Sequence, residues 1–186
     1  MLDIFGKPDD CSSDYNSDKI QNIFSSGKSV AAILMAIMQD KGHFKYSDKV
    51  AHHWPEFAQN GKEHILIADV LRHECGLHKL QKPLDLEWLK TENLKKNMVG
   101  EIIESDTPFW LTEEKRKDPF NVDERQYHAV TRDWITNEIF RRVEPNGRTM
   151  GEYLRDDQKT FGDIYIGLRD PKLFEQVEEL VGVPGK

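Results

Sequence analysis

The stretch VAAILMAIM, residues 30–38, is the most apolar part of this chain and constrains its fold more than any other feature. A helix that is apolar on nearly all sides is buried in a globular protein. We therefore predict a buried helix here, ending near Gly42, at the centre of the fold. The large side chains that recur at helical spacing, with alanines on the other faces, are Val30, Ile33, Leu34, Ile37 and Met38.

The remainder of the chain is polar. Hydrophobic residues make up 38% and charged residues 32% of the 186 positions, and the mean hydropathy is −0.68. A chain of this length suffices for one domain. Its low apolar content predicts either a large solvent-exposed surface or a core to which residues outside this chain contribute. No apolar run approaches the roughly 20 residues of a membrane span. The start, MLDIFGKPDD, lacks the pattern of a secretory signal, so we expect an intracellular, cytoplasmic protein.

Local patterns divide the chain further. Residues 1–19 are polar and predict a loose N-terminal segment, followed by one domain over residues 20–186. Thr149 and Glu152 have the spacing of a helix-capping pair. A short strand is predicted at 163–166. Further helices are predicted at 65–72, at 84–103 with a break near Thr91, at 128–143 and at 171–181, and long connections at 43–64 and 105–127.

Charge and cysteine content exclude several classes of function. Lys and Arg total 26 against 33 Asp and Glu, a net charge of −7, and no basic block offers a nucleic-acid binding face. Cys11 and Cys75 do not form a disulfide framework and predict free thiols in a reducing compartment. In HECGLH, residues 73–78, the second histidine comes one position too late for the H-E-x-x-H zinc motif. We expect no metal and no organic cofactor.

The sequence SSGK, from Ser25 to Lys28, directly precedes the apolar helix and has the Ser-x-x-Lys spacing of a nucleophile motif. Residues three apart share a helix face, so the Lys28 amine can reach the Ser25 hydroxyl. A serine hydroxyl needs a neighbouring base to take its proton. Burial and the positive end of the helix dipole both favour the neutral amine that such a base requires. The pattern therefore predicts acyl-enzyme chemistry on Ser25.

Two other interpretations of these residues remain open. Ser-x-x-Lys arises by chance in most chains of this size, and a serine beside a helix start is usually a cap. The end of the segment, Gly27-Lys28-Ser29, also looks like the end of a phosphate-binding loop. Asn22 stands where the first glycine of that loop belongs, and no buried strand precedes it, which argues against a nucleotide site.

Further motifs follow in order. The chain has WPEF at 54–57, HECGL at 73–77, YHAVTRDWITNEIFRRVEPNGRTMGEYLRDD at 127–157 and DIYIGL at 163–168. Together with Ser-x-x-Lys, they resemble the serine β-lactamase-related and penicillin-binding-protein-like hydrolases, above all the esterase-like members and the animal β-lactamase-domain proteins. The resemblance implies an α+β fold of the β-lactamase/transpeptidase type. This chain would hold mostly its helical lobe, with little strand, as a partial domain over 20–186 that lacks the C-terminal catalytic strands.

The resemblance also assigns roles to single residues. Ser25 matches the acylated serine and Lys28 the motif lysine that acts as its base. Tyr127 matches the tyrosine of the second motif, whose phenol relays protons. His73 and Trp54 are expected to be structural, holding a turn and a loop. The implied substrate is a small ester or amide.

Two departures from the family pattern qualify that assignment. The second motif has Ala129 where an Asn contacts the side-chain amide of antibiotics, which favours esters or other acyl substrates. The third motif, Lys-Thr-Gly or His-x-Gly on a strand beside the serine, is missing. We interpret the near match KTFG at 159–162 as a coincidence, because it lies between the second-motif helices and DIYIGL.

Two hypotheses about function follow. The first is a serine hydrolase, with Ser25 within hydrogen-bond reach of Lys28 and Tyr127 in the same cleft. The second is a catalytically impaired, truncated relative that acts as a binding or assembly module. The missing strands should leave one side of the helix over 30–38 uncovered, and such an apolar patch is expected to favour self-association.

Overall fold

The computed structural model describes residues 18–111 and 125–178, and helices dominate this part of the chain. Its only β-pairing within those ranges consists of two isolated bridges, Ile20 with Val177 and Lys49 with Leu66. The predicted strand at 163–166 is wrong, because no neighbouring strand in the described ranges pairs with it. None of the helices in these ranges combines the length and the apolar character needed to cross a bilayer. The predicted loose segment 1–19 lies almost entirely outside the described residues.

Helix α1, Gly27–Asp40, is the predicted apolar helix, and Gly42 beyond its end has a φ of 78°, which a glycine adopts without strain. The side of α1 that faces away from the core is uncovered: Ile33 is 56% exposed, and Ala36 is also exposed. Burial on nearly all sides is therefore wrong for this helix, whereas the expected uncovered side is found. The residues that it buries are Ala31, Leu34, Met35 and Met38.

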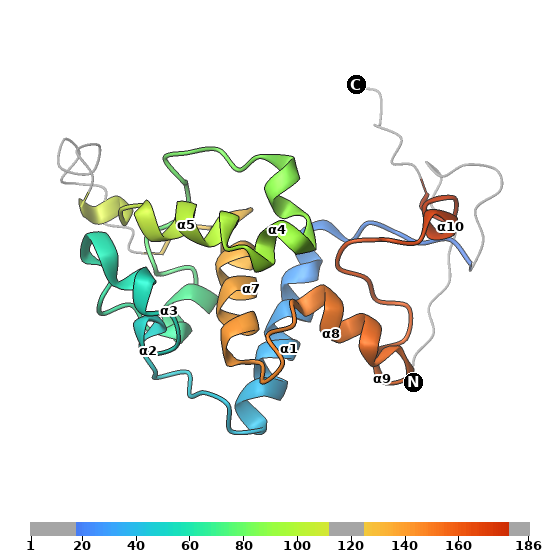
Figure 1. Ribbon diagram of the computed structural model, residues 1–186, viewed down its shortest axis with the longest axis horizontal. Coiled ribbons are helices and arrows are strands. Elements are labelled where there is room, and N and C mark those ends of the chain that lie inside the picture. The colour runs from blue at the N-terminus through green and yellow to red at the C-terminus, as the bar shows by residue number, and fades with distance from the viewer. Residues whose placement is uncertain (1–17, 112–124, 179–186) are drawn as a thin grey trace.

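Helix α7, Thr131–Val143, occupies the centre of the fold, where we had expected α1 (Figure 1). It contacts α1 and four other helices on different sides. Its apolar residues Ile135, Ile139 and Phe140 are buried, and so are many of its polar residues. The other four helices are α2 (Val50–His53), α3 (Ile67–Leu71), α5 (Met98–Ser105) and α8 (Met150–Asp156).

A buried polar network allows such a polar helix to lie in the core. The Glu138 carboxylate accepts hydrogen bonds from Arg141 and Arg142, both at 2.6 Å. The Arg142 guanidinium lies 4.0 Å from the centre of the Trp54 ring, and Trp54 Nε1 donates to Glu104 Oε1 at 2.7 Å. Because these charges pair with one another, they can lie in the interior. The chain therefore fills its core with fewer apolar side chains than an ordinary domain uses.

The segment predicted as a long connection has more helical structure than expected, whereas the predicted broken helix is more interrupted than expected. The connection 43–64 contains α2 and the 3₁₀ helix η2, Pro55–Gly61. The break near Thr91 is confirmed, since η3, Leu86–Leu89, precedes α4, Thr91–Lys95. A second break follows at Asn97, whose φ is 67°, before α5 begins. The last described residues before the gap form η4, Phe109–Leu111.

The predicted capping pair begins α8. Thr149 Oγ1 accepts a hydrogen bond from Glu152 N at 3.3 Å, and Glu152 Oε2 accepts one from Thr149 N at 2.9 Å. The near match to a third motif, KTFG at 159–162, falls on α9, Gln158–Phe161, and its end, so it lies in no strand. The last described helix, α10, is Pro171–Phe174 and thus shorter than the predicted 171–181, of which 179–181 lie outside the described residues.

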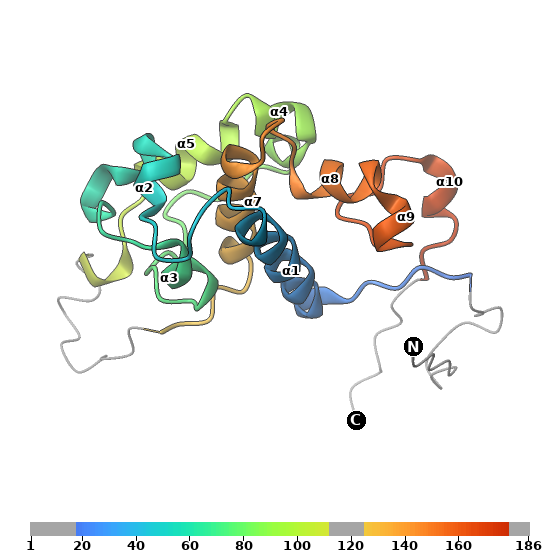
Figure 2. The same cartoon turned by 90° about the horizontal axis from the view of Figure 1, so that it is seen from below.

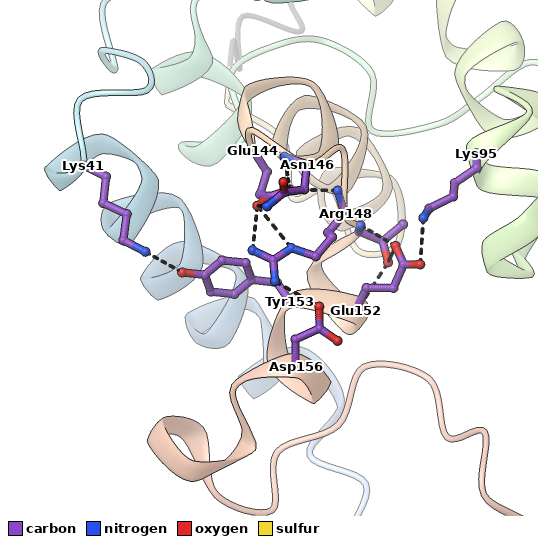
Figure 3. A network of polar contacts seen from close by, with 9 residues as sticks. Lys41, Lys95, Glu144, Asn146, Arg148, Glu152, Tyr153 and Asp156 are labelled. Carbon is purple, nitrogen blue, oxygen red and sulfur yellow. Dashed lines mark hydrogen bonds and ion pairs between the residues drawn. The ribbon is translucent and has the colours of Figure 1, made fainter.

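Ion pairs attach α8 to its neighbours (Figure 3). Arg148 bridges Glu144 at 2.7 Å and Asp156 at 2.9 Å, which fixes the turn between α7 and α8. Lys41, just after α1, donates to the Tyr153 hydroxyl at 2.8 Å. These contacts hold α8 against both α1 and α7.

The two ends of the described chain lie side by side, as Figure 2 shows for the segment before α1 and α10. Ile20 N donates to Gln176 O at 2.8 Å, and Glu178 N donates to Ile20 O at 3.0 Å. The segment that leads into Ser25 is therefore anchored beside α10 rather than free.

Lys62 is fully buried and caps the end of α5, where helix carbonyls lack partners. Its Nζ donates to Glu104 O at 2.9 Å and also to Asp106 O. Burial lowers the pKa of Lys62 to about 8, despite the opposing effect of the Asp106 and Glu104 carboxylates. A neutral amine keeps two N–H donors, so both carbonyls stay paired after Lys62 loses its proton.

We predict that Lys62 makes the protein more stable as the pH rises above 8. Between its folded pKa of about 8 and the ordinary 10.5, the unfolded chain binds more protons, so stability rises with pH in this window. The gain from pH 8 to 9.5 should be about 2 kcal/mol. Urea unfolding at both pH values, compared with Lys62→Met, measures it. An equal pH response of the two proteins would contradict the prediction.

Candidate active site

Ser25 lies in η1, Phe24–Ser26, the 3₁₀ turn that runs directly into α1. Its side chain is exposed, and so are those of Ile23 and Phe24, at 51% and 69%. Phe24 has a φ of 43°, a left-handed conformation that is strained for an aromatic residue. The serine is thus presented to solvent on a sharp turn ahead of the helix.

Lys28 has a largely buried side chain, 13% exposed, and its amine points toward the segment that begins α7. Nζ donates to Ala129 O at 2.7 Å and to Asp133 Oδ2 at 3.0 Å. It also lies 5.4 Å from the centre of the Tyr127 ring. The structure thus brings Lys28 and Tyr127 together, although they are far apart in the sequence.

The expected hydrogen bond between the Ser25 hydroxyl and the Lys28 amine is not formed in the part of the chain that the structure describes. The Lys28 amine bonds Ala129 and Asp133 instead. The ammonium form of a lysine carries a third proton on Nζ and has no lone pair. A lysine that acts as a base must therefore first lose this proton.

Sequence reasoning missed Asp133. It lies in the first turn of α7, and its other oxygen accepts from Arg132 at 2.8 Å. One signal could have found it: a lysine held out of water needs an anionic partner, and Asp133 is the first acidic residue after Tyr127 in the sequence.

His73 holds the Tyr127 segment in place. It has a φ of 66°, its Nδ1 accepts from His128 N at 3.0 Å, and its ring centre lies 5.0 Å from that of Tyr127. Its backbone carbonyl accepts from Gln126 N at 3.2 Å. Burial, followed by the charges of nearby cations, lowers the pKa of His73, which keeps Nδ1 free to accept. These contacts agree with the structural role expected for His73.

Cys75 does not qualify as a nucleophile. Its Sγ lies 3.2 Å from His128 Nε2, which also accepts from Leu77 N at 3.1 Å. Burial raises the pKa of the Cys75 thiol to about 12 and lowers the pKa of His128 to about 4. Both groups are therefore neutral, and the thiolate that attacks is not formed. The described residues also hold no cluster of three or more potential metal ligands, and HECGLH lies outside any helix.

A family model, a protein sequence and solved structures that resemble this chain all point to the same kind of relative. The family model Beta-lactamase matches residues 8–160. Esterase/beta-lactamase LipL of Mycobacterium tuberculosis is 25% identical over 143 residues, which are 77% of this chain and 29% of that protein. A penicillin-binding protein homolog from Caulobacter crescentus is 32% identical with a TM-score of 0.72, over 90% of this chain and 42% of that one.

A family VIII carboxylesterase has the same TM-score of 0.72 at 27% identity, over 89% of this chain and 42% of that one. This chain therefore spans less than half the length of each of these relatives. Its fold is of the β-lactamase/transpeptidase type, mostly helical with little strand, as the sequence predicted.

Proposed function

This chain belongs to the β-lactamase family, and from that premise we propose that it carries the nucleophile half of a serine hydrolase site for small ester or amide substrates. In this proposal Ser25 is the nucleophile, Lys28 its base and Tyr127 the proton relay. One observation supports it most. Lys28 follows the exposed Ser25 by one helical turn, and its amine lies beside the Tyr127 ring.

The Ser25 hydroxyl gives its proton to a neutral Lys28 amine while its oxygen bonds the acyl carbon. Tyr127 passes its proton to the departing alcohol or amine as the acyl–leaving-group bond breaks, and it is reprotonated by Lys28. Water then attacks the acyl carbon, gives one proton through the same pair back to the Ser25 oxygen and releases the acid. A neutral Lys28 still donates two N–H groups, to Ala129 O and Asp133, so its lone pair remains for the serine proton.

A second candidate function is supported by exposed apolar side chains before and along α1 and ahead of α7. Phe24, Ile33, Tyr127 and Val130 are each more than half exposed, and Val130 is 62% exposed. A surface of this kind favours association, as expected for a binding or assembly module that has lost catalysis. For both candidate functions we propose a reducing, intracellular compartment, because Cys75 is a buried free thiol.

Covalent labelling with a fluorophosphonate probe tests the catalytic proposal. We expect one adduct per chain, located on Ser25 by peptide mass mapping, and no adduct on Ser25→Ala. The matched control is Ser26→Ala, because Ser26 is also exposed in the same turn, and this change should leave labelling unchanged. A folded wild-type chain that stays unlabelled over hours, or an adduct that persists in Ser25→Ala, would favour the binding module.

A further inference from the structure

A pocket of about 260 Å³ lies between α1, α4, α7 and α8, and Ser25 is not among the residues that line it. Gly27 and Ala31 form its wall on α1, one turn apart on the same face. Leu94 lies on α4 and Met150 at the start of α8. The pocket is therefore separate from the Ser25 hydroxyl, although it adjoins the helix that follows it.

Most of the pocket wall is apolar. Trp134 and Ile166 add to the apolar side chains already named. An apolar cavity of about 150 Å³ holds benzene, so this one has room for about nine or ten non-hydrogen atoms. The size and lining suit a small aromatic or aliphatic group.

One unpaired donor distinguishes this pocket from an ordinary packing gap. Asn137 lines it and is only 7% exposed. Its Oδ1 accepts from Met150 N at 3.0 Å, which fixes the orientation of the amide. Its Nδ2 has no hydrogen-bond partner in the described part of the chain. A buried donor left unpaired is costly, so an occupant with an acceptor would gain a hydrogen bond there.

Charge at the pocket limits what that acceptor can be. Asp133 is its only ionisable residue among those described, and no cationic side chain lines it. Lys28 and Arg132 already pair with Asp133, so a carboxylate or phosphate would find no cation of its own at this pocket. A neutral carbonyl oxygen can accept from the free Asn137 donor, and it adds no second charge beside the Asp133 carboxylate.

We propose that this pocket is a binding site for a neutral, mostly apolar carbonyl compound of about nine or ten non-hydrogen atoms, whose oxygen accepts from Asn137 Nδ2. The site is independent of acyl transfer on Ser25. Binding can therefore be measured on the Ser25→Ala chain, and a failed labelling experiment would leave this proposal intact.

Two probes of matched shape test the proposal. Acetophenone carries a carbonyl where cumene carries a methyl-bearing carbon, so only acetophenone can accept from Asn137. We expect saturation-transfer NMR to detect both on the full chain. Asn137→Asp keeps the acceptor for Met150 N and removes the donor. It should lower the affinity for acetophenone relative to cumene by about fivefold.

A second pair of variants serves if Asn137→Asp does not fold. Ala31→Leu fills the pocket and should abolish binding of both probes. Ala36→Leu makes the same change on an exposed face of α1 and should preserve it. No binding to the wild-type chain would show a water-filled gap only. Equal binding to the two leucine variants, or an affinity ratio unchanged by Asn137→Asp, would also overturn the proposal.

Discussion

The 186-residue chain is expected to hydrolyse p-nitrophenyl esters about 10²–10³-fold more slowly than the family VIII carboxylesterase in the same assay. An oxyanion hole uses two donors, and under the proposal above the backbone N–H of Ser25 is one of them. The described residues place no strand beside Ser25 to supply the other, since their β-pairing is limited to the bridges at Ile20–Val177 and Lys49–Leu66. Losing one such donor accounts for the expected factor.

The control for this assay is Ser25→Ala, which should remove whatever turnover the chain has. Ser26→Ala should leave it unchanged, because Ser26 is offset from the face that Lys28 shares with Ser25. Turnover as fast as that of the carboxylesterase, and lost in Ser25→Ala, would contradict the prediction. It would show that another group completes the oxyanion hole.

Local signals predicted the elements that depend on neighbouring residues. The period of the apolar residues located α1, and the pair Thr149–Glu152 located the start of α8. The break before Thr91 was also found. Each of these features is decided by side chains within one or two turns of one another, which is the range over which a pattern carries information.

The centre of the fold could not be predicted in this way. Helix α7 carries Arg132, Glu138 and Arg142, and such charges normally mark a solvated face. Their burial depends on partners that are distant in the sequence, such as Leu71 O, which accepts from Arg132. The periodicity of a sequence does not show which charged side chains will pair in the fold. From the sequence alone, the polar core was therefore visible only as a low content of apolar residues.

The candidate site divides in the same way. Ser25, Lys28 and Tyr127 were found because motif and family resemblance specify residue types in order. Asp133 and Asn137 were not, because their significance depends on what α1 and α8 bring against α7. A motif locates residues that touch substrate, whereas the groups that hold or surround them follow from packing.

The network around Glu138 provides the largest expected effect on stability. Its side chain is fully buried, while Arg141 and Arg142 are 14% and 15% exposed. Burial lowers the pKa of Arg142, although Glu138 opposes that effect. Removing one partner of a buried ion pair leaves an uncompensated charge, which costs about 3–5 kcal/mol. A typical domain has only about 5–15 kcal/mol of stability in total.

We therefore expect Glu138→Gln to lower the free energy of unfolding, measured in urea, by about 3–5 kcal/mol. Glu101→Gln is the matched control, because Glu101 is exposed on α5 and its change should stay within about 0.5 kcal/mol. A loss below about 1 kcal/mol for Glu138→Gln would contradict the prediction. It would mean that Asn97 Oδ1, which accepts from both guanidinium groups at 2.7 Å, suffices to hold Arg141 and Arg142 in the core.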